Sequence, residues 1–163
     1  MVWVEQFVVK HALCPFAALP LRQGRVVAVE CSAPDPEAAF YWALSQVQWL
    51  IEKEPGEVET SLLVFPAHFS DFEDFLALVE AIEEALAESG ADELIQLAHF
   101  HPHYVFADVA KDDSGNLTNR APWGTVQLLR VGSVAGAVAG YGGVQAIPEK
   151  NIALMRKLYP AQD

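Results

Sequence analysis

The sequence predicts an α+β domain of two layers, in which a mixed sheet of about four strands is covered by amphipathic helices. The chain has 163 residues, of which 52% are apolar, enough for one domain with a core and too few for two. We therefore expect a single domain over residues 1–163. Short β-branched segments alternate with longer segments that carry one apolar stripe, the pattern of helices that pack on a sheet. A three-layer α/β sandwich is the alternative architecture.

The residues up to Phe65 predict two helices and two strands. The helices span about 3–12 and 36–53, and the strands span about 25–30 and 61–65. The first helix should end before Cys14-Pro15, because a proline disfavours helical geometry in the residue before it. Asp35 is the expected N-cap of the second helix, and Pro36 suits its first position, where no N–H is needed. Leu19-Pro20 is expected to be loop.

The residues from Ser70 onward predict two more helices and two more strands. The helices span about 71–89 and 148–158, and the strands span about 93–100 and 125–131. For 125–131 a short helix is the alternative. Ser70 and Glu73 have the spacing of a capping box, and Gly90 suits the left-handed position that follows a helix. The glycines between 132 and 143 predict a flexible connection, because they do not complete a G-x-G-x-x-G dinucleotide frame.

The charge and the cysteine content exclude several classes of protein. The chain carries 10 Lys plus Arg against 22 Asp plus Glu, a formal net charge of −12. Such a charge repels phosphate backbones and anionic lipids, so we expect neither nucleic acid nor a membrane as a partner. Cys14 and Cys31 are too few for a disulfide framework, and the first residues lack the basic segment of a signal peptide. We therefore predict a cytoplasmic protein, and the oligomeric state stays open.

Three histidines, His99, His101 and His103, occupy alternate positions at the end of the third predicted strand. In an extended strand they share one face, and His-x-His can give two imidazoles to one metal ion. The outer two would lie about 13 Å apart, too far for one ion unless Pro102 bends the chain. We predict no metal site and no cofactor.

A second group of residues suggests covalent chemistry. The thiol of Cys14, the imidazole of His101 and the amide of Asn119 could form a nucleophile, a general base and an orienting group. We name His101 and Cys14 as the candidate catalytic residues. The alternative for Cys14 is a structural cysteine, because a position beyond a helix C-terminus raises the pKa of a thiol.

A third group lies in the polar turn that follows the histidines. Arg120 offers a rigid fork to a carboxylate or phosphate, and Asn116, Thr118 and Asn119 supply neutral hydrogen bonds beside it. We predict that these four residues bind an anionic ligand. The alternative is an internal ion pair of Arg120 with a carboxylate such as Asp108 or Glu59.

Four motifs are distributed along nearly the whole chain. They are Cys14-Pro15-Phe16-Ala17, Glu59-Thr60-Ser61-Leu62-Leu63, Phe100-His101-Pro102-x-Tyr104-x-Phe106 and Asn116-x-Thr118-Asn119-Arg120-x-Pro122. These motifs resemble those of an uncharacterised bacterial family that is catalogued only as a domain of unknown function. The residues that the resemblance assigns to the family pattern are Cys14, His101, Asn119 and Arg120. After Pro122 the chain departs from that pattern, because Gln127 and Val131 stand where the family tends to have His and Glu.

The sequence therefore leaves the function unknown, with two hypotheses. The first is a small cytoplasmic enzyme or ligand-binding domain that acts on an anionic small molecule, with Arg120 at the anion and His101 as general acid or base. The second is a non-catalytic structural or interaction domain, in which Cys14, His101 and Arg120 form a buried polar network. An open pocket lined by all three residues favours the first hypothesis, and mutual burial without a cavity favours the second.

Overall fold

The computed structural model describes residues 1–160 and contains one sheet of four strands in the order β1-β2-β4-β3. The strands are β1 (Val26–Glu30), β2 (Thr60–Phe65), β3 (Ile95–Phe100) and β4 (Gly124–Arg130). β1 is parallel to β2, and β4 is antiparallel to both β2 and β3. Three strands therefore point the same way and end at one edge of the sheet, where β4 begins. The predicted α+β fold with a mixed four-stranded sheet is confirmed.

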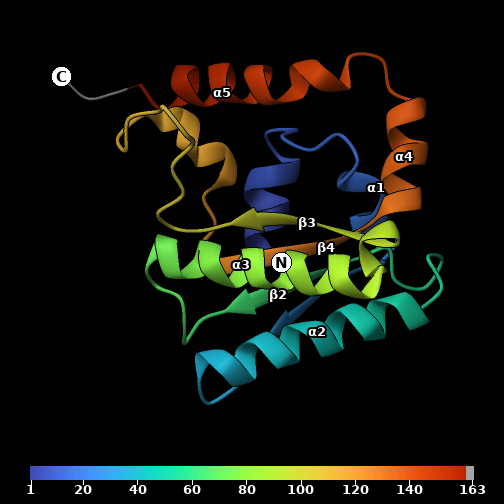
Figure 1. Ribbon diagram of the computed structural model, residues 1–163. Coiled ribbons are helices and arrows are strands. Elements are labelled where there is room, and N and C mark those ends of the chain that lie inside the picture. The colour runs from blue at the N-terminus through green and yellow to red at the C-terminus, as the bar shows by residue number, and fades with distance from the viewer. Residues whose placement is uncertain (161–163) are drawn as a thin grey trace.

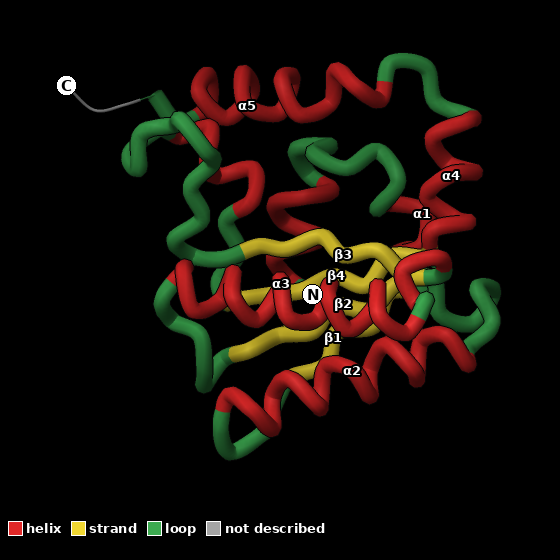
Figure 2. Tube along the Cα trace, in the orientation of Figure 1, coloured by secondary structure: helices red, strands yellow, loops and turns green. Residues whose placement is uncertain are grey.

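Two long helices, α2 (Pro36–Glu52) and α3 (Phe72–Ser89), lie side by side against one face of the sheet (Figures 1 and 2). They bury the main hydrophobic core against the strands. Among its fully buried members are Ala43, Leu50, Leu63, Phe75, Ile82, Val126 and Leu128. Burial of about 25 cal/mol per Å² of apolar surface makes this layer the principal source of stability.

The ends of these helices follow from local chemistry. Asp35 caps α2 as predicted, and its carboxylate accepts from the Ala38 N–H at 2.8 Å. The predicted capping box at Ser70 is wrong, because Asp71 is the N-cap of α3 and accepts from the N–H groups of the next turn. Gly90 takes the left-handed conformation after α3, with φ of 75°.

The other face of the sheet receives the N-terminal segment. Strand parity sends Phe100 to the face opposite His99, and the Trp3 ring packs against Phe100 at 5.2 Å. The predicted first helix is a short π-helix, η1 (Val4–Val9), and α1 (Ala18–Arg22) contains Leu19 and Pro20, which we expected in a loop. Pro20 is tolerated there because the N–H groups of a first helical turn have no intrahelical partner.

The C-terminal part adds α4 (Val131–Ala139) and α5 (Ile147–Leu158), which lie on the side of the sheet away from α2 and α3 (Figure 1). The expected flexible glycine segment is therefore wrong over 131–139, where alanines and valines between the glycines sustain a helix. α5 packs on a short 3₁₀ helix, η3 (Ser114–Asn119). Within residues 1–160, no helix is long and apolar enough to cross a membrane.

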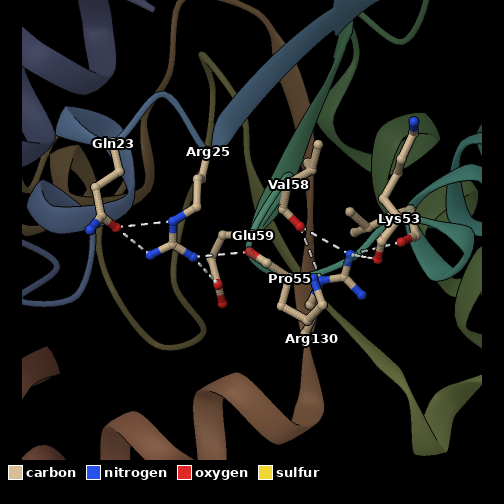
Figure 3. A network of polar contacts seen from close by, with 8 residues as sticks. Gln23, Arg25, Lys53, Pro55, Val58, Glu59 and Arg130 are labelled. Carbon is tan, nitrogen blue, oxygen red and sulfur yellow. Dashed lines mark hydrogen bonds and ion pairs between the residues drawn. The ribbon is translucent and has the colours of Figure 1, made fainter.

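Two arginines hold the edge of the sheet where β1 and β2 begin (Figure 3). Arg130, at the end of β4, donates to the carbonyls of Leu50 at 2.8 Å and Lys53 at 2.6 Å, at the C-terminus of α2. Its Nε also donates to the Val58 carbonyl at 3.2 Å. A cation at a helix C-terminus is favourable, and Arg130 adds a second donor to the Leu50 carbonyl, which also accepts from the Lys53 N–H at 3.1 Å. Nearby, Arg25 pairs with Glu59 at 2.6 Å.

Candidate functional site

Three chain segments meet at the edge of the sheet where β1, β2 and β3 end. They are the connection from β2 to α3, the turn after β3, and the residues that lead into β4. Strand pairing places Phe65 opposite Gly124, and Phe100 opposite Thr125. The His101 N–H donates to the Asn119 carbonyl at 3.1 Å, so the two ends of the 101–119 excursion are held together.

His101 lies at the centre of this edge and is fully buried. Its ring stacks between Phe72 and Phe75 of α3, with centroid distances of 5.3 and 5.1 Å. Nδ1 accepts from the His103 backbone N–H at 3.1 Å, and Nε2 lies 2.9 Å from the Phe69 carbonyl. A ring whose Nδ1 accepts carries its proton on Nε2, which then donates to Phe69. Burial lowers the pKa of His101, which keeps the ring neutral.

The bond from His101 fixes an unusual backbone conformation. Phe69 has φ of 59°, in the left-handed region that side chains other than glycine rarely adopt. Such a conformation costs about 1–3 kcal/mol and persists only where surrounding contacts impose it. His101 thus holds the β2–α3 connection, and its two nitrogens are both bound to main-chain groups.

The other two histidines of the alternating set differ in their surroundings, although the His103 ring lies 5.7 Å from the His101 ring. The His99 ring lies 6.4 Å from Phe75 and 5.6 Å from Tyr104, and burial lowers its pKa. The chain turns after His101, and the His103 side chain is exposed. Among residues 1–160, no three His, Cys, Asp or Glu side chains are grouped in a way that could hold a metal ion.

The three neutral residues of the predicted anion site bind main-chain groups of their own loop or of strand β3 before it. Asn116 is fully buried, accepts from the Phe106 N–H at 3.0 Å and donates to the Ala110 carbonyl at 2.8 Å. The Thr118 hydroxyl donates to the Gly115 carbonyl at 3.0 Å. The Asn119 amide donates to the His99 carbonyl at 3.4 Å. These side chains define the path of the loop that joins β3 to β4.

Arg120 extends this framework. Its Nε donates to the Tyr104 carbonyl at 3.1 Å and its Nη2 donates to the Lys111 carbonyl at 2.7 Å. The expected alternative, an ion pair with Asp108 or Glu59, is wrong: Glu59 pairs with Arg25, and Arg120 makes no ion pair within residues 1–160.

Cys14 lies apart from this framework. The preceding residue, Leu13, accepts a hydrogen bond on its carbonyl from Asn151 of α5 at 2.7 Å, and Phe16 packs on Tyr141 at 5.4 Å. These contacts place the segment with the C-terminal helices, whereas the His101 ring lies against α3. Burial raises the pKa of the Cys14 thiol. The structure therefore brings His101, Asn116, Thr118, Asn119 and Arg120 into one loop system, whereas the segment of Cys14 is bonded to α5, which packs on η3 of that loop.

A hollow of about 230 Å³ opens where the three segments meet, and we call it the histidine hollow. It is lined by residues 65–70, 101–103 and 122–124. His68, His101 and His103 are among them, and the lining contains no Asp, Glu, Lys or Arg. Neither Cys14 nor Arg120 lines it. His101 therefore lines the hollow, but both of its ring nitrogens are bound to main-chain groups.

Two residues of the histidine hollow were not predicted. Trp123 is 53% exposed. His68 is bound to the main chain: its Nε2 donates to the Ala33 carbonyl at 2.8 Å, which requires the proton on Nε2. The sequence signals were weak: Trp123 follows Pro122 and His68 lies two residues after Pro66, and a nearby proline in a loop does not fix the direction of a side chain.

Comparisons with known proteins give one match. The model of the family DUF1415, described as a protein of unknown function, matches residues 1–162. No curated protein and no solved structure is significantly similar to the chain. The predicted similarity to a domain-of-unknown-function family is confirmed over nearly the whole sequence.

Proposed function

We propose that this chain, which belongs to the DUF1415 family, binds a small anionic molecule in the histidine hollow. The observation that carries the proposal is a hollow at the carboxyl edge of three strands with a shared direction, lined by three imidazoles and an exposed indole and by no carboxylate. In a chain with 22 acidic residues, a cavity without a carboxylate favours a ligand that carries negative charge.

The position of the hollow supports binding. In open sheets that contain parallel strands, ligands are found outside the carboxyl ends of the strands, because the connecting loops there diverge and leave a crevice. β2 and β3 run in the same direction and are separated by the antiparallel β4, so the loops that follow them leave the sheet on either side of the start of β4. The hollow lies between those loops.

The exposed groups of the hollow suggest separate parts for the ligand. The His103 ring and the Ser70 hydroxyl are exposed, and they are the donors that we assign to a carboxylate or phosphate. The exposed face of Trp123 and the adjacent rings of Pro102 and Pro122 would contact a flat or apolar part of the molecule. Pockets with mainly apolar walls and a few polar groups are typical of small-molecule sites.

The residues predicted from sequence have a positioning role in this proposal. His101 holds the Phe69 and His103 walls of the hollow, while Asn116 and Arg120 hold the loop behind it. The second sequence hypothesis expected Cys14, His101 and Arg120 to form a polar network. The hydrogen bonds of His101 and Arg120 agree with that expectation, whereas Cys14 forms no part of that network within residues 1–160. Catalysis by His101 or Cys14 stays a prediction. A cytoplasmic location also stays a proposal, supported by two cysteines that are both free.

A ligand screen with a local signal tests the proposal. Small carboxylates and phosphates, with and without aromatic rings, are added to the protein while tryptophan fluorescence and amide NMR shifts are recorded. We expect at least one compound class to change the Trp123 emission and the amide signals of residues 66–70 and 101–103. His103→Ala and Trp123→Phe should weaken this binding, whereas Tyr41→Phe, an exposed aromatic change on α2, should leave it unchanged. Binding that persists in His103→Ala and Trp123→Phe would refute the site.

A further inference from the structure

We propose that the outer surface of α2 and α3 binds a basic amphipathic segment of another protein in an apolar groove between the two helices. The groove encloses about 480 Å³. Phe40 from α2 and Ala77, Leu78 and Ala81 from α3 supply its apolar lining, and His68 and Phe69 complete it. The groove shares His68 and Phe69 with the histidine hollow, but Ser70, His103 and Trp123, to which we assign the ligand of the hollow, do not line the groove.

The groove exists because small residues stand where α3 faces outward along α2. Asp74, Ala77, Leu78 and Ala81 have the i, i+3, i+4, i+7 spacing of one helical face. Ala77 is exposed and Ala81 is half-buried, so neither fills the space beside Phe40. Leu78 is buried beneath them. An apolar groove between two helices accepts large side chains that a partner helix presents with the same periodicity.

The negative charge of α2 and α3 favours a positively charged partner. α2 carries two carboxylates and α3 carries six, and neither helix contains a lysine or an arginine. Two of these carboxylates, Glu37 and Asp74, stand at the groove itself. A segment with lysines or arginines beside its apolar residues would meet carboxylates on both helices, which favours fast and specific association.

The same charge argues against the other occupants of such a groove. A second copy of the chain would bring another net charge of −12 to an acidic surface. An acidic or neutral segment would bury its apolar residues beside unpaired carboxylates. The groove therefore fits a cationic, amphipathic partner segment.

The test uses a fluorescently labelled helical peptide of leucine and lysine, with its leucines on one face, and the full chain. Fluorescence anisotropy should show saturable 1:1 binding that weakens with added salt. Ala77→Trp fills the groove and should weaken the peptide affinity at least about tenfold. The matched control Ala87→Trp makes the same change on an exposed alanine of α3 outside the groove, and it should bind like the unmodified protein.

Charge and pattern are tested separately. Asp74→Asn should weaken binding, whereas Glu73→Gln, which removes an exposed carboxylate from the same helical turn but not from the groove, should have a smaller effect. An isomer of the peptide with its leucines spread around the helix should bind at least about tenfold more weakly. The proposal is overturned by equal binding of both peptides, by equal effects of Ala77→Trp and Ala87→Trp, or by no saturable binding. A dimer of the chain that Ala77→Trp dissociates would also overturn it, since the occupant would then be a second copy.

Discussion

Replacement of His101 by phenylalanine tests whether this residue holds two loops through its ring nitrogens. Phenylalanine keeps an aromatic ring between Phe72 and Phe75, so most of the stacking and apolar contact is retained. It removes the bonds to the Phe69 carbonyl and the His103 N–H. The substitution therefore separates hydrogen bonding from packing.

The expected loss follows from those two groups. A buried polar group that loses its partner costs about 1–3 kcal/mol. Phe69 is half-buried and the His103 residue is exposed, so water reaches part of this region and the lower end of the range applies to each. We expect His101→Phe to lower the free energy of unfolding by about 2 kcal/mol. His103→Ala keeps the backbone N–H that His101 binds, and it should cost less than about 0.5 kcal/mol.

The same histidine should make stability depend on pH. An unfolded histidine takes up its proton near pH 6.5, whereas burial lowers the pKa of His101 in the folded protein. Below that pH the unfolded state binds more protons, so the contribution of the neutral ring is complete above about pH 6.5 and is lost as the pH falls through the folded pKa. His99 adds a dependence of the same sign, because burial also lowers its pKa.

Urea unfolding, followed by circular dichroism between about pH 7.5 and pH 5, measures both effects. The unmodified protein should lose stability on acidification, and His101→Phe should lose less over the same range, since only the His99 part remains. A variant whose unfolding free energy lies within about 0.5 kcal/mol of the unmodified protein, with the same pH dependence, would refute the assigned role of His101.

Three further predictions concern packing, an edge of the sheet and a thiol. Gly124→Ala would place a Cβ 3.1 Å from the Phe75 ring, so we expect the free energy of unfolding in urea to fall by about 1–3 kcal/mol. Gly136→Ala, with nothing within 4 Å of the new Cβ, should be neutral or stabilising. Equal effects of the two substitutions would contradict the packing of Gly124 against Phe75. Arg130→Met should cost about 2–3 kcal/mol, because it leaves carbonyls at the end of α2 without their charged donor, and a melting temperature that does not fall would exclude this role. Because burial raises the pKa of Cys14, its thiol should react with iodoacetamide more slowly than a free model thiol near pH 8. The rate is measured in a variant in which Cys31 is replaced by serine. A faster reaction than that of the model thiol would support the nucleophile hypothesis.

Features that depend on neighbouring residues were predictable. Asp35 and Gly90 mark helix ends because a cap needs only a few adjacent residues, and the strands were recognisable from β-branched segments. The cap of α3 was misassigned between two adjacent polar residues, Ser70 and Asp71. The choice between them depends on the direction in which the chain enters the helix, and the left-handed Phe69 sets that direction.

The candidate site was predictable only in part. The sequence located its residues in the segment after β3, but it assigned Arg120 to a ligand or a carboxylate. Its partners are carbonyls of Tyr104 and Lys111, and their positions depend on the path of a long loop. The sequence also could not tell that Trp123 is exposed. Residue type fixes which bonds a side chain can form, whereas the course of the backbone decides which partners come within reach.

By itself the amino-acid sequence determined the fold class, the main helices and strands and the acidic character of the surface, because each of these depends on short-range periodicity or on composition. Only the tertiary structure decided that Cys14 lies apart from His101, that His101 is bound at both nitrogens, and that a hollow without carboxylates opens beside it. Those outcomes depend on contacts between segments that are distant in the chain, and a local pattern carries no information about which face of a sheet a distant segment will cover.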